Sequence, residues 1–273
     1  MAGSPEAVAV AFACVERNVR AALRAPARLL GSPRSPPGGC CIIPFDALVL
    51  HLATVAAMVA FLVWLWAHAS DKPLRAALLT FVVLAAWLAG VAALALAGIT
   101  LRTDLRPPGG FLTLGPALLV VGIVLFTLTR ARLRTTLYRM PLEALLWAQA
   151  FRFPVEIVLA MLADAGLLPR LMTFHGSNFD ILTALTAPLA AGAARRGWWR
   201  AVIAWNLVGL ALVINVVGTA ILAFSGPLNV IKVVPPADFA MTFPMVWLPG
   251  FLVPVAILLH GLALLKAHRA RAA

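Results

Sequence analysis

Long apolar blocks separated by short polar connections dominate the chain from residue 47 onward. Each block holds the roughly 20 residues that an α-helix needs to cross the hydrocarbon core of a bilayer. The pattern predicts membrane-spanning helices at residues 47–67, 76–98, 111–129, 145–168, 178–194, 199–223 and 243–265. The fifth is the shortest and is also compatible with a re-entrant segment. The expected fold class is all-α, a polytopic transmembrane helix bundle of about seven spans.

Composition agrees with this pattern and leaves little room for a soluble domain. Hydrophobic residues make up 63% of the 273 residues and charged residues 12%, whereas soluble domains have about 45–50% and about 25%. A net charge of +12 would suit a nucleic-acid-binding protein, but the basic residues lie in short connections, where they fix membrane topology. We therefore expect no nucleic-acid partner, and a lipid bilayer as the surroundings.

Basic residues are distributed unevenly between the two ends of the predicted spans. The first, third and fifth connections and the C-terminal tail together hold twelve Lys and Arg residues, whereas the second, fourth and sixth connections hold four. Cytoplasmic connections are rich in these residues. The expected localisation is the inner (cytoplasmic) membrane, with the C-terminus in the cytoplasm and, for seven spans, the N-terminus outside.

The N-terminal region differs from the rest of the chain. Arg17, Arg20, Arg24 and Arg28 recur at helical spacing, which predicts a basic amphipathic helix suited to an anionic cytoplasmic surface. This disagrees with the connection count, so the location of the segment stays open. The predicted organisation is a basic segment and linker at 1–46, a helix bundle at 47–268 and a cytoplasmic tail at 269–273.

Motifs of known catalytic chemistry are absent from the sequence. There is no phosphate-binding glycine loop, zinc-protease helix signature or serine-nucleophile elbow. Cys14, Cys40 and Cys41 precede the first apolar block and have no metal or disulfide spacing. Aspartates and histidines near the outer ends could supply a metal site, but no two share a ligand spacing. We therefore assign no metal ligand and no catalytic residue, and the cofactor is unknown.

Polar side chains lie along one face of the fourth predicted span. Gln149, Arg152 and Glu156 fall at i, i+3 and i+7, and Asp164 roughly continues the stripe. A charge near the centre of a membrane helix costs ~2.5–3.5 kcal/mol, and such residues usually face inward and are paired. Arg152 and Glu156 can pair with each other at i, i+4. The stripe indicates either a polar pocket or proton-linked site, or a structural ion pair.

The connection before the fifth span reads His-Gly-Ser-Asn-Phe-Asp from His175 to Asp180. Ser177 and Asp180 have the spacing of a capping box, which predicts a helix that starts at Ser177. The same helix N-terminus, with His175 and Asn178 beside it, could instead hold an anionic or polar group. Two further polar residues inside later spans, Asn215 and His260, complete the set of pocket candidates.

Two stretches carry a resemblance to a known family. The first comprises Met172-Thr173-Phe174, Gly176 and Asn178-Phe179-Asp180, and the second runs from Val246-Trp247-Leu248-Pro249 through Pro254 to His260. Together they resemble an uncharacterised family of bacterial multi-pass membrane proteins, over roughly residues 150–265. The resemblance implies no known activity, and no functional residue follows from it.

These observations favour a small permease, or a solute- or lipid-binding membrane protein with a polar intramembrane pocket. The pocket candidates are Gln149, Arg152, Glu156, Asp164, His175, Asn178, Asp180, Asn215 and His260. Two alternatives stay open: an intramembrane enzyme, in one version metal-dependent, and an accessory subunit of a membrane complex in which the charged residues only order the helices. The enzyme is the less favoured, because no catalytic motif supports it.

Overall fold

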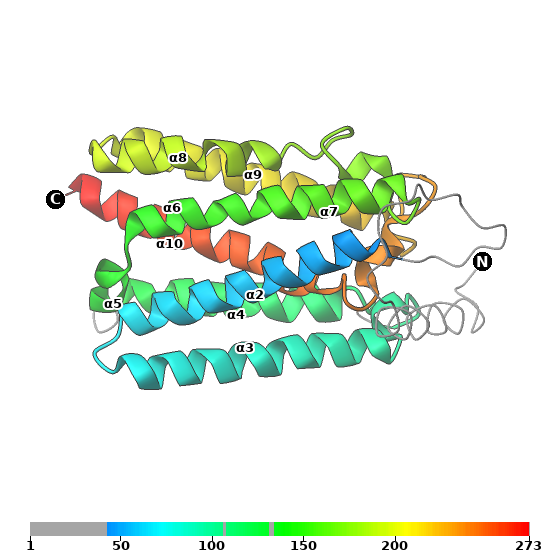
Figure 1. Ribbon diagram of the computed structural model, residues 1–273, viewed down its shortest axis with the longest axis horizontal. Helices are drawn as coiled ribbons and strands as arrows, with labels where there is room; N and C mark the ends of the chain where they lie inside the picture. The colour runs from blue at the N-terminus through cyan, green and yellow to red at the C-terminus, as the bar shows by residue number, and fades with distance from the viewer. Residues whose placement is uncertain (1–42, 106–107, 131–133, 273) are drawn as a thin grey trace.

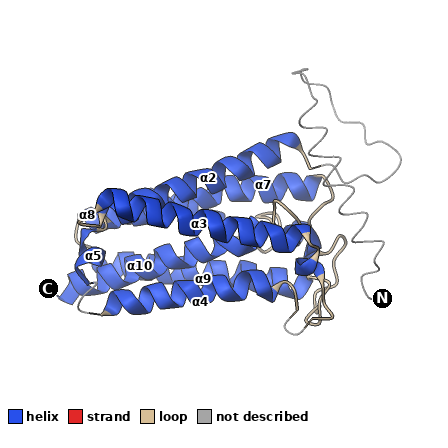
Figure 2. Ribbon diagram, turned by 90° about the horizontal axis from the view of Figure 1, so that it is seen from below, coloured by secondary structure: helices blue, strands red, loops and turns tan. Residues whose placement is uncertain are grey.

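A computed structural model describes residues 43–105, 108–130 and 134–272, which form a bundle of helices (Figure 1). No strand occurs in this part of the chain, and the loops gather at the two ends of the bundle (Figure 2). The predicted amphipathic helix and linker lie mostly in residues 1–42, outside the described residues. The α-helices are α2 (Phe45–His68), α3 (Pro73–Leu96), α4 (Phe111–Thr129), α5 (Arg134–Arg139), α6 (Leu142–Ala148), α7 (Arg152–Asp164), α8 (Ile181–Arg195), α9 (Trp199–Ala223) and α10 (Val253–Ala272). The short elements are the 3-10 turns η1 (Ile99–Leu101), η2 (Gln149–Phe151), η3 (Arg170–Met172) and η4 (Ala237–Met241), and the π-helix η5 (Leu248–Leu252).

The predicted all-helical membrane bundle is confirmed. Among the described residues, six helical stretches are long and apolar enough to cross a membrane, and they match six of the predicted spans. The remaining one, α8, has 15 residues. At 1.5 Å per residue it is about 22 Å long, shorter than the ~30 Å hydrocarbon core of a bilayer. The six apolar helices fit a multi-pass membrane protein.

The bundle has two distinct ends (Figure 1). One, which we call the C-terminal end, carries the C-terminus together with the α2–α3, α4–α6 and α8–α9 connections. The opposite end carries the α3–α4, α7–α8 and α9–α10 connections. The connections and tail rich in Lys and Arg all lie at the C-terminal end.

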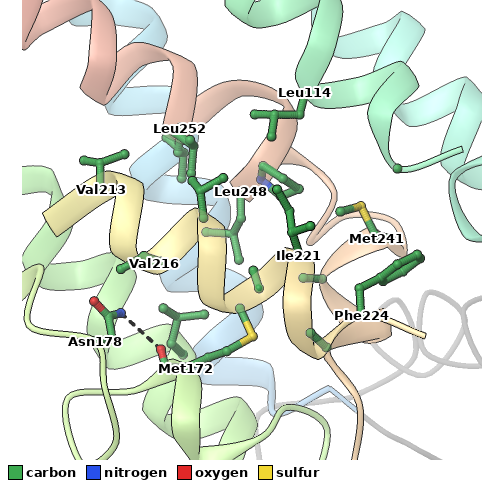
Figure 3. Close-up of a pocket in the computed structure, with 18 of the residues that line it drawn as sticks. Leu114, Met172, Asn178, Val213, Val216, Ile221, Phe224, Met241, Leu248 and Leu252 are labelled. Carbon is green, nitrogen blue, oxygen red and sulfur yellow. Dashed lines mark hydrogen bonds between the residues drawn. The ribbon is translucent and has the colours of Figure 1, made fainter. Parts of the chain in front are cut away.

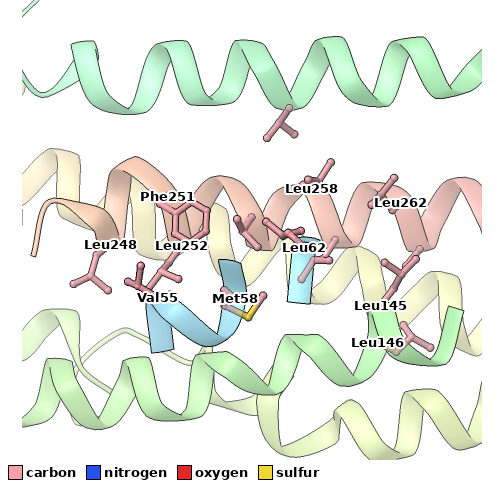
Figure 4. Close-up of a cluster of buried hydrophobic side chains, with 14 of the residues drawn as sticks. Val55, Met58, Leu62, Leu145, Leu146, Leu248, Phe251, Leu252, Leu258 and Leu262 are labelled. Carbon is pink, nitrogen blue, oxygen red and sulfur yellow. The ribbon is translucent and has the colours of Figure 1, made fainter. Parts of the chain in front are cut away.

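Helix α10 lies at the centre of the bundle, where it packs against α4, α6 and α9, while α2 packs against α3 and α7. Buried apolar side chains from three of these elements interdigitate (Figure 4). They include Met58 and Leu62 of α2, Leu145 of α6, and Leu258 and Leu262 of α10. Because lipid tails are as apolar as these side chains, van der Waals packing rather than escape from water holds the helices together.

Helix α3 lies at the edge of the bundle, and Val91 is its single buried residue. Two reciprocal indole bonds attach it to the start of the last span. Trp87 Nε1 donates to the Gly250 carbonyl at 2.8 Å, and Trp247 Nε1 donates to the Leu88 carbonyl at 3.0 Å. Apart from its contact with α2, most of the surface of α3 faces outward.

Two spans are irregular where prolines occur. Pro154 has no N–H to donate to the carbonyl of Ala150, and its ring crowds that carbonyl. The helix tightens at this place into the 3-10 turn η2, between α6 and α7. In the last span, Pro249 lies within the π-helix η5, and α10 follows from Val253. The last span thus begins at Leu248, later than the predicted 243, and its helix continues through most of the predicted tail.

Candidate functional site

A cavity of about 140 Å³ lies between α4, α7, α9 and the η5–α10 segment, in the half of the bundle away from the C-terminal end (Figure 3). Most of its wall is apolar, with Leu114 from α4, Val213 and Ile221 from α9, and Leu248 and Leu252 from the last span. An apolar cavity of ~150 Å³ engineered in another protein holds benzene. This cavity therefore has room for a small apolar group.

Four polar side chains line the cavity, which we call the polar quartet: Arg152, Glu156, Asn178 and Asp180. Arg152 projects from the first turn of α7 and is 2% exposed. Its Nη1 donates to Asp180 Oδ1 at 2.6 Å, and the Asp180 side chain is 18% exposed. The arginine charge is thus compensated by a carboxylate from a segment 28 residues further along the chain.

Glu156 is held by the α7–α8 connection. Its Oε1 accepts the backbone N–H of Phe174 at 2.5 Å, and its Oε2 accepts the side-chain amide of Asn178 at 2.6 Å, the bond drawn in Figure 3. The predicted Arg152–Glu156 pair is therefore wrong. Each of the two charged residues instead pairs with the connection, because that segment folds inward and offers both a carboxylate and amide donors.

The α7–α8 connection is built by local hydrogen bonds and one close approach. A Cβ on Gly176 would lie 2.5 Å from Leu171 Cα and 2.6 Å from the Arg170 carbonyl oxygen, so only glycine fits there. The Asp180 N–H donates to Asn178 Oδ1 at 3.0 Å, which forms a turn stabilised by the Asn side chain. This turn directs Asn178 and Asp180 toward α7.

The predicted capping box is also wrong. Helix α8 begins at Ile181 with Asp180 as its N-cap, and no side chain caps it. The Ser177 hydroxyl donates to the Leu171 carbonyl at 3.1 Å, and the Asp180 carboxylate accepts from Arg152. Both side chains predicted to cap the helix therefore bond elsewhere, and the helix starts later than predicted.

The tightened turn of one helix and the start of another meet at the Arg152–Asp180 pair. Arg152 lies near the middle of the span Leu142–Asp164, directly after the 3-10 turn η2. Asp180 precedes the first residue of the short helix α8, so the N-terminus of α8 lies deep within the bundle. Non-helical backbone at membrane depth is tolerated where it is buried in protein or lines a cavity. The partial positive charge of the α8 N-terminus also favours the Asp180 carboxylate.

A second group of buried polar side chains adjoins Arg152, and we call it the inner polar cluster: Gln149, Thr183, Asn206 and His260. His260 Nδ1 donates to Asn206 Oδ1 at 2.8 Å, and Gln149 Nε2 donates to the Ala256 carbonyl at 3.3 Å. The backbone of Gly209 lies against the His260 ring, and its carbonyl oxygen is 3.4 Å from Arg152 Nη1.

The structure separates the predicted pocket residues into three groups. Arg152, Glu156, Asn178 and Asp180 come together at the cavity, whereas Gln149 and His260 belong to the inner polar cluster. The remaining three candidates, Asp164, His175 and Asn215, do not line the cavity. Asp164 is exposed and pairs with Arg170 at 3.4 Å. His175 is exposed beside Phe174, with ring centroids 4.0 Å apart. Asn215 is exposed, and its amide donates to the Ser177 carbonyl at 2.8 Å.

Three residues of the inner polar cluster and its surroundings were not among the pocket candidates: Thr183, Asn206 and Gly209. Asn206, like Asn215, is an amide in a mostly apolar span, which is the one signal that could have found it. Its partner His260 is 54 residues away, so no local spacing joins them. Among the described residues, no group of three or more His, Cys, Asp or Glu side chains is arranged to hold a metal ion.

Comparison with known proteins gives one match. A family model for a domain of unknown function, DUF8737, matches residues 110–267. No curated protein and no solved structure matches the chain. The matched region begins at the start of α4 and contains the polar quartet and the inner polar cluster, whereas α2 and α3 precede it. Because the match covers more than half of the 273 residues, the protein belongs to the DUF8737 family.

Proposed function

We propose that this protein binds a small amphiphilic molecule, a lipid or a mainly apolar solute with one polar group, inside the membrane as a permease or carrier. The observation that carries the proposal is the cavity of about 140 Å³ with an apolar wall and a single polar quartet. Ligand sites typically combine a predominantly apolar lining with a few placed polar groups. The apolar part of the ligand lies against α4, α9 and α10, and its polar group faces the quartet.

The position of the quartet supports a permease rather than a passive structural protein. Transporters commonly build their sites near the bilayer midplane from discontinuous helices, where freed backbone groups and helix ends face the substrate. Here the 3-10 turn η2 and the start of the short helix α8 coincide at the Arg152–Asp180 pair. Charged residues are costly inside a membrane and usually mark a substrate or ion pathway.

The binding step is tested by filling the cavity. Ala220 of α9 lines it, whereas Ala211 of the same helix faces outward. The wild-type protein is purified in mild detergent, and bound small molecules are identified by native mass spectrometry. Ala220→Phe should lose the bound molecule, and the matched variant Ala211→Phe should retain it. Equal ligand content in both variants would contradict the proposal.

The polar end is tested by Glu156→Gln, which keeps the shape of the side chain and removes its charge. We expect binding or transport of the identified molecule to be lost while expression and the monodisperse elution profile remain those of the wild type. Unchanged uptake into proteoliposomes would show that Glu156 has only a structural role.

The same purification separates the alternatives. Stoichiometric zinc in the purified protein would favour a metal-dependent intramembrane enzyme. A protein partner that co-purifies at constant ratio, with no small molecule bound, would favour an accessory subunit. The bound amphiphile is the result that the proposal requires.

A further inference from the structure

The inner polar cluster and the adjoining Arg152 contain several buried polar atoms that find no partner among the residues that the structure describes. These atoms are Arg152 Nε and Nη2, Gln149 Oε1, Thr183 Oγ1 and His260 Nε2. All four side chains are at least 97% buried. Buried polar atoms in folded proteins are almost always paired with protein or ordered water, so a concentration of unpartnered atoms indicates an occupant.

Three of these four side chains, Arg152, Thr183 and His260, lie around Gly209. A Cβ at this position would lie 2.5 Å from His260 Cε1, 2.7 Å from His260 Nε2 and 3.2 Å from Thr183 Cγ2. The Gly209 carbonyl is also in contact with the Arg152 guanidinium at 3.4 Å. The absence of a side chain at Gly209 thus lets the histidine ring, the threonine and the arginine approach the same stretch of backbone between α8, α9 and α10.

The hydrogen bonds around the unpartnered atoms determine which of these atoms can donate and which can accept. Asn206 Nδ2 donates to the Val202 carbonyl at 2.8 Å, so Asn206 Oδ1 accepts the proton of His260 Nδ1. His260 Nε2 therefore presents a lone pair. Gln149 Oε1 is also an acceptor, because its Nε2 donates to Ala256. Arg152 Nε and Nη2 can only donate.

The occupant must both donate and accept. A cation would be repelled by Arg152, and an anion would face the lone pairs of Gln149 and His260. Water satisfies donors and acceptors together and typically makes about three hydrogen bonds in a buried site. We propose that the inner polar cluster binds ordered water, and that Arg152 separates this hydrated site from the apolar cavity on its other side.

This arrangement extends the polar region toward the C-terminal end. The polar quartet lies on one side of Arg152, and His260 and Asn206 lie on the other. Water beside His260 Nε2 would donate a hydrogen bond to the lone pair of that nitrogen, deep within the bundle. The proposal does not depend on what the cavity binds.

X-ray radiolytic footprinting of the full-length protein in nanodiscs tests the proposal, because hydroxyl radicals formed from bound water oxidise the side chains beside it. His260 is the probe, exposed His175 is the reference for bulk water, and buried Met58 is the reference for a dry core. Samples are mixed briefly with ¹⁸O-water before exposure. His260 should be oxidised although it is fully buried, with less ¹⁸O than His175, and Met58 should stay unmodified.

A variant removes the partners of the water and keeps the probe. Gln149→Leu combined with Thr183→Val should abolish the labelling of His260, whereas Thr219→Val on α9 should leave it unchanged. The proposal is overturned if His260 in the wild type is as unreactive as Met58, which would mean that Arg152 bonds directly to His260 in a dry core. It is also overturned if the folded double variant keeps wild-type labelling. Should the double variant fail to fold, the wild-type comparison decides alone.

Discussion

Gly209→Ala should destabilise the protein although alanine is the better helix former. The new methyl group would lie 2.5 Å from His260 Cε1 and 2.7 Å from His260 Nε2, well inside van der Waals contact. The ring cannot retreat without disturbing its 2.8 Å bond to Asn206. Gly209 itself is buried, so the backbone has no free side toward which to move.

The magnitude follows from three opposing contributions. Alanine in place of glycine in a helix interior gains about 0.5–1 kcal/mol. Overpacking a tight core costs about 1–3 kcal/mol, and a weakened buried hydrogen bond costs about 0.5–1.5 kcal/mol. The net loss of unfolding free energy is therefore about 0.5–4 kcal/mol, which lowers the melting temperature of a chain of this size by several degrees near the middle of that range.

The matched control lies on the same helix. A Cβ at Gly218 meets no atom within 4 Å, so Gly218→Ala should raise stability by about 0.5–1 kcal/mol from helix propensity alone. Thermal unfolding of the two variants in detergent, followed by intrinsic tryptophan fluorescence, should give shifts of opposite sign. A Gly209→Ala protein at least as stable as wild type would refute the packing described around His260. Adding His260→Ala should recover part of the loss, because it removes the atoms with which the methyl group collides.

Three further predictions follow from the polar quartet and the orientation of the bundle. Asp180→Asn leaves the buried Arg152 charge uncompensated and should cost about 3–5 kcal/mol of unfolding free energy. Chemical denaturation measures this loss. The double variant Asp180→Asn with Arg152→Met should be more stable than Asp180→Asn alone. Gly176→Ala should displace the α7–α8 connection, because its Cβ would meet the backbone of Leu171 at 2.5 Å; faster amide hydrogen exchange at Phe174, whose N–H bonds to Glu156, is the expected result, and unchanged protection would argue against it. A reporter that works only in the cytoplasm should be active when it is fused to the C-terminus, because the connections rich in Lys and Arg lie at that end. Activity of a reporter that works only in the periplasm would contradict the predicted orientation.

The sequence predicted the spans well because each is a long apolar block, and length and hydropathy are local properties. The four residues of the polar quartet were among nine pocket candidates, because charged and amide side chains in a membrane usually face the bundle interior. The other five candidates do not line the cavity. The membrane side of the C-terminus and the identity of the membrane stay predictions.

The pairing within the site could not be predicted in the same way. Arg152 and Glu156 lie four residues apart on one helix, and this spacing favoured an intrahelical pair. The observed partners come from a connection whose inward fold depends on a glycine contact with Leu171 and on the turn at Asn178. These are tertiary features, which local sequence spacing does not report. The capping-box pattern at Ser177 is likewise only a sequence pattern, and it does not require a helix to begin there.

The position of α2 has a consequence for how the protein is made. His51 Nε2 donates to the carbonyl of Pro244 at 3.1 Å, across 193 residues of chain. At a synthesis rate of about 5–20 residues per second, that carbonyl leaves the ribosome ~10–40 s after His51. During the first half of this interval the α2–α3 hairpin stands in the membrane without α7, and during all of it without the last span. Its inward-facing polar groups His51 and Thr54 are then without their later surroundings. Substitutions in α2 should therefore act first on the nascent chain, as faster degradation during insertion, before they affect any finished binding site.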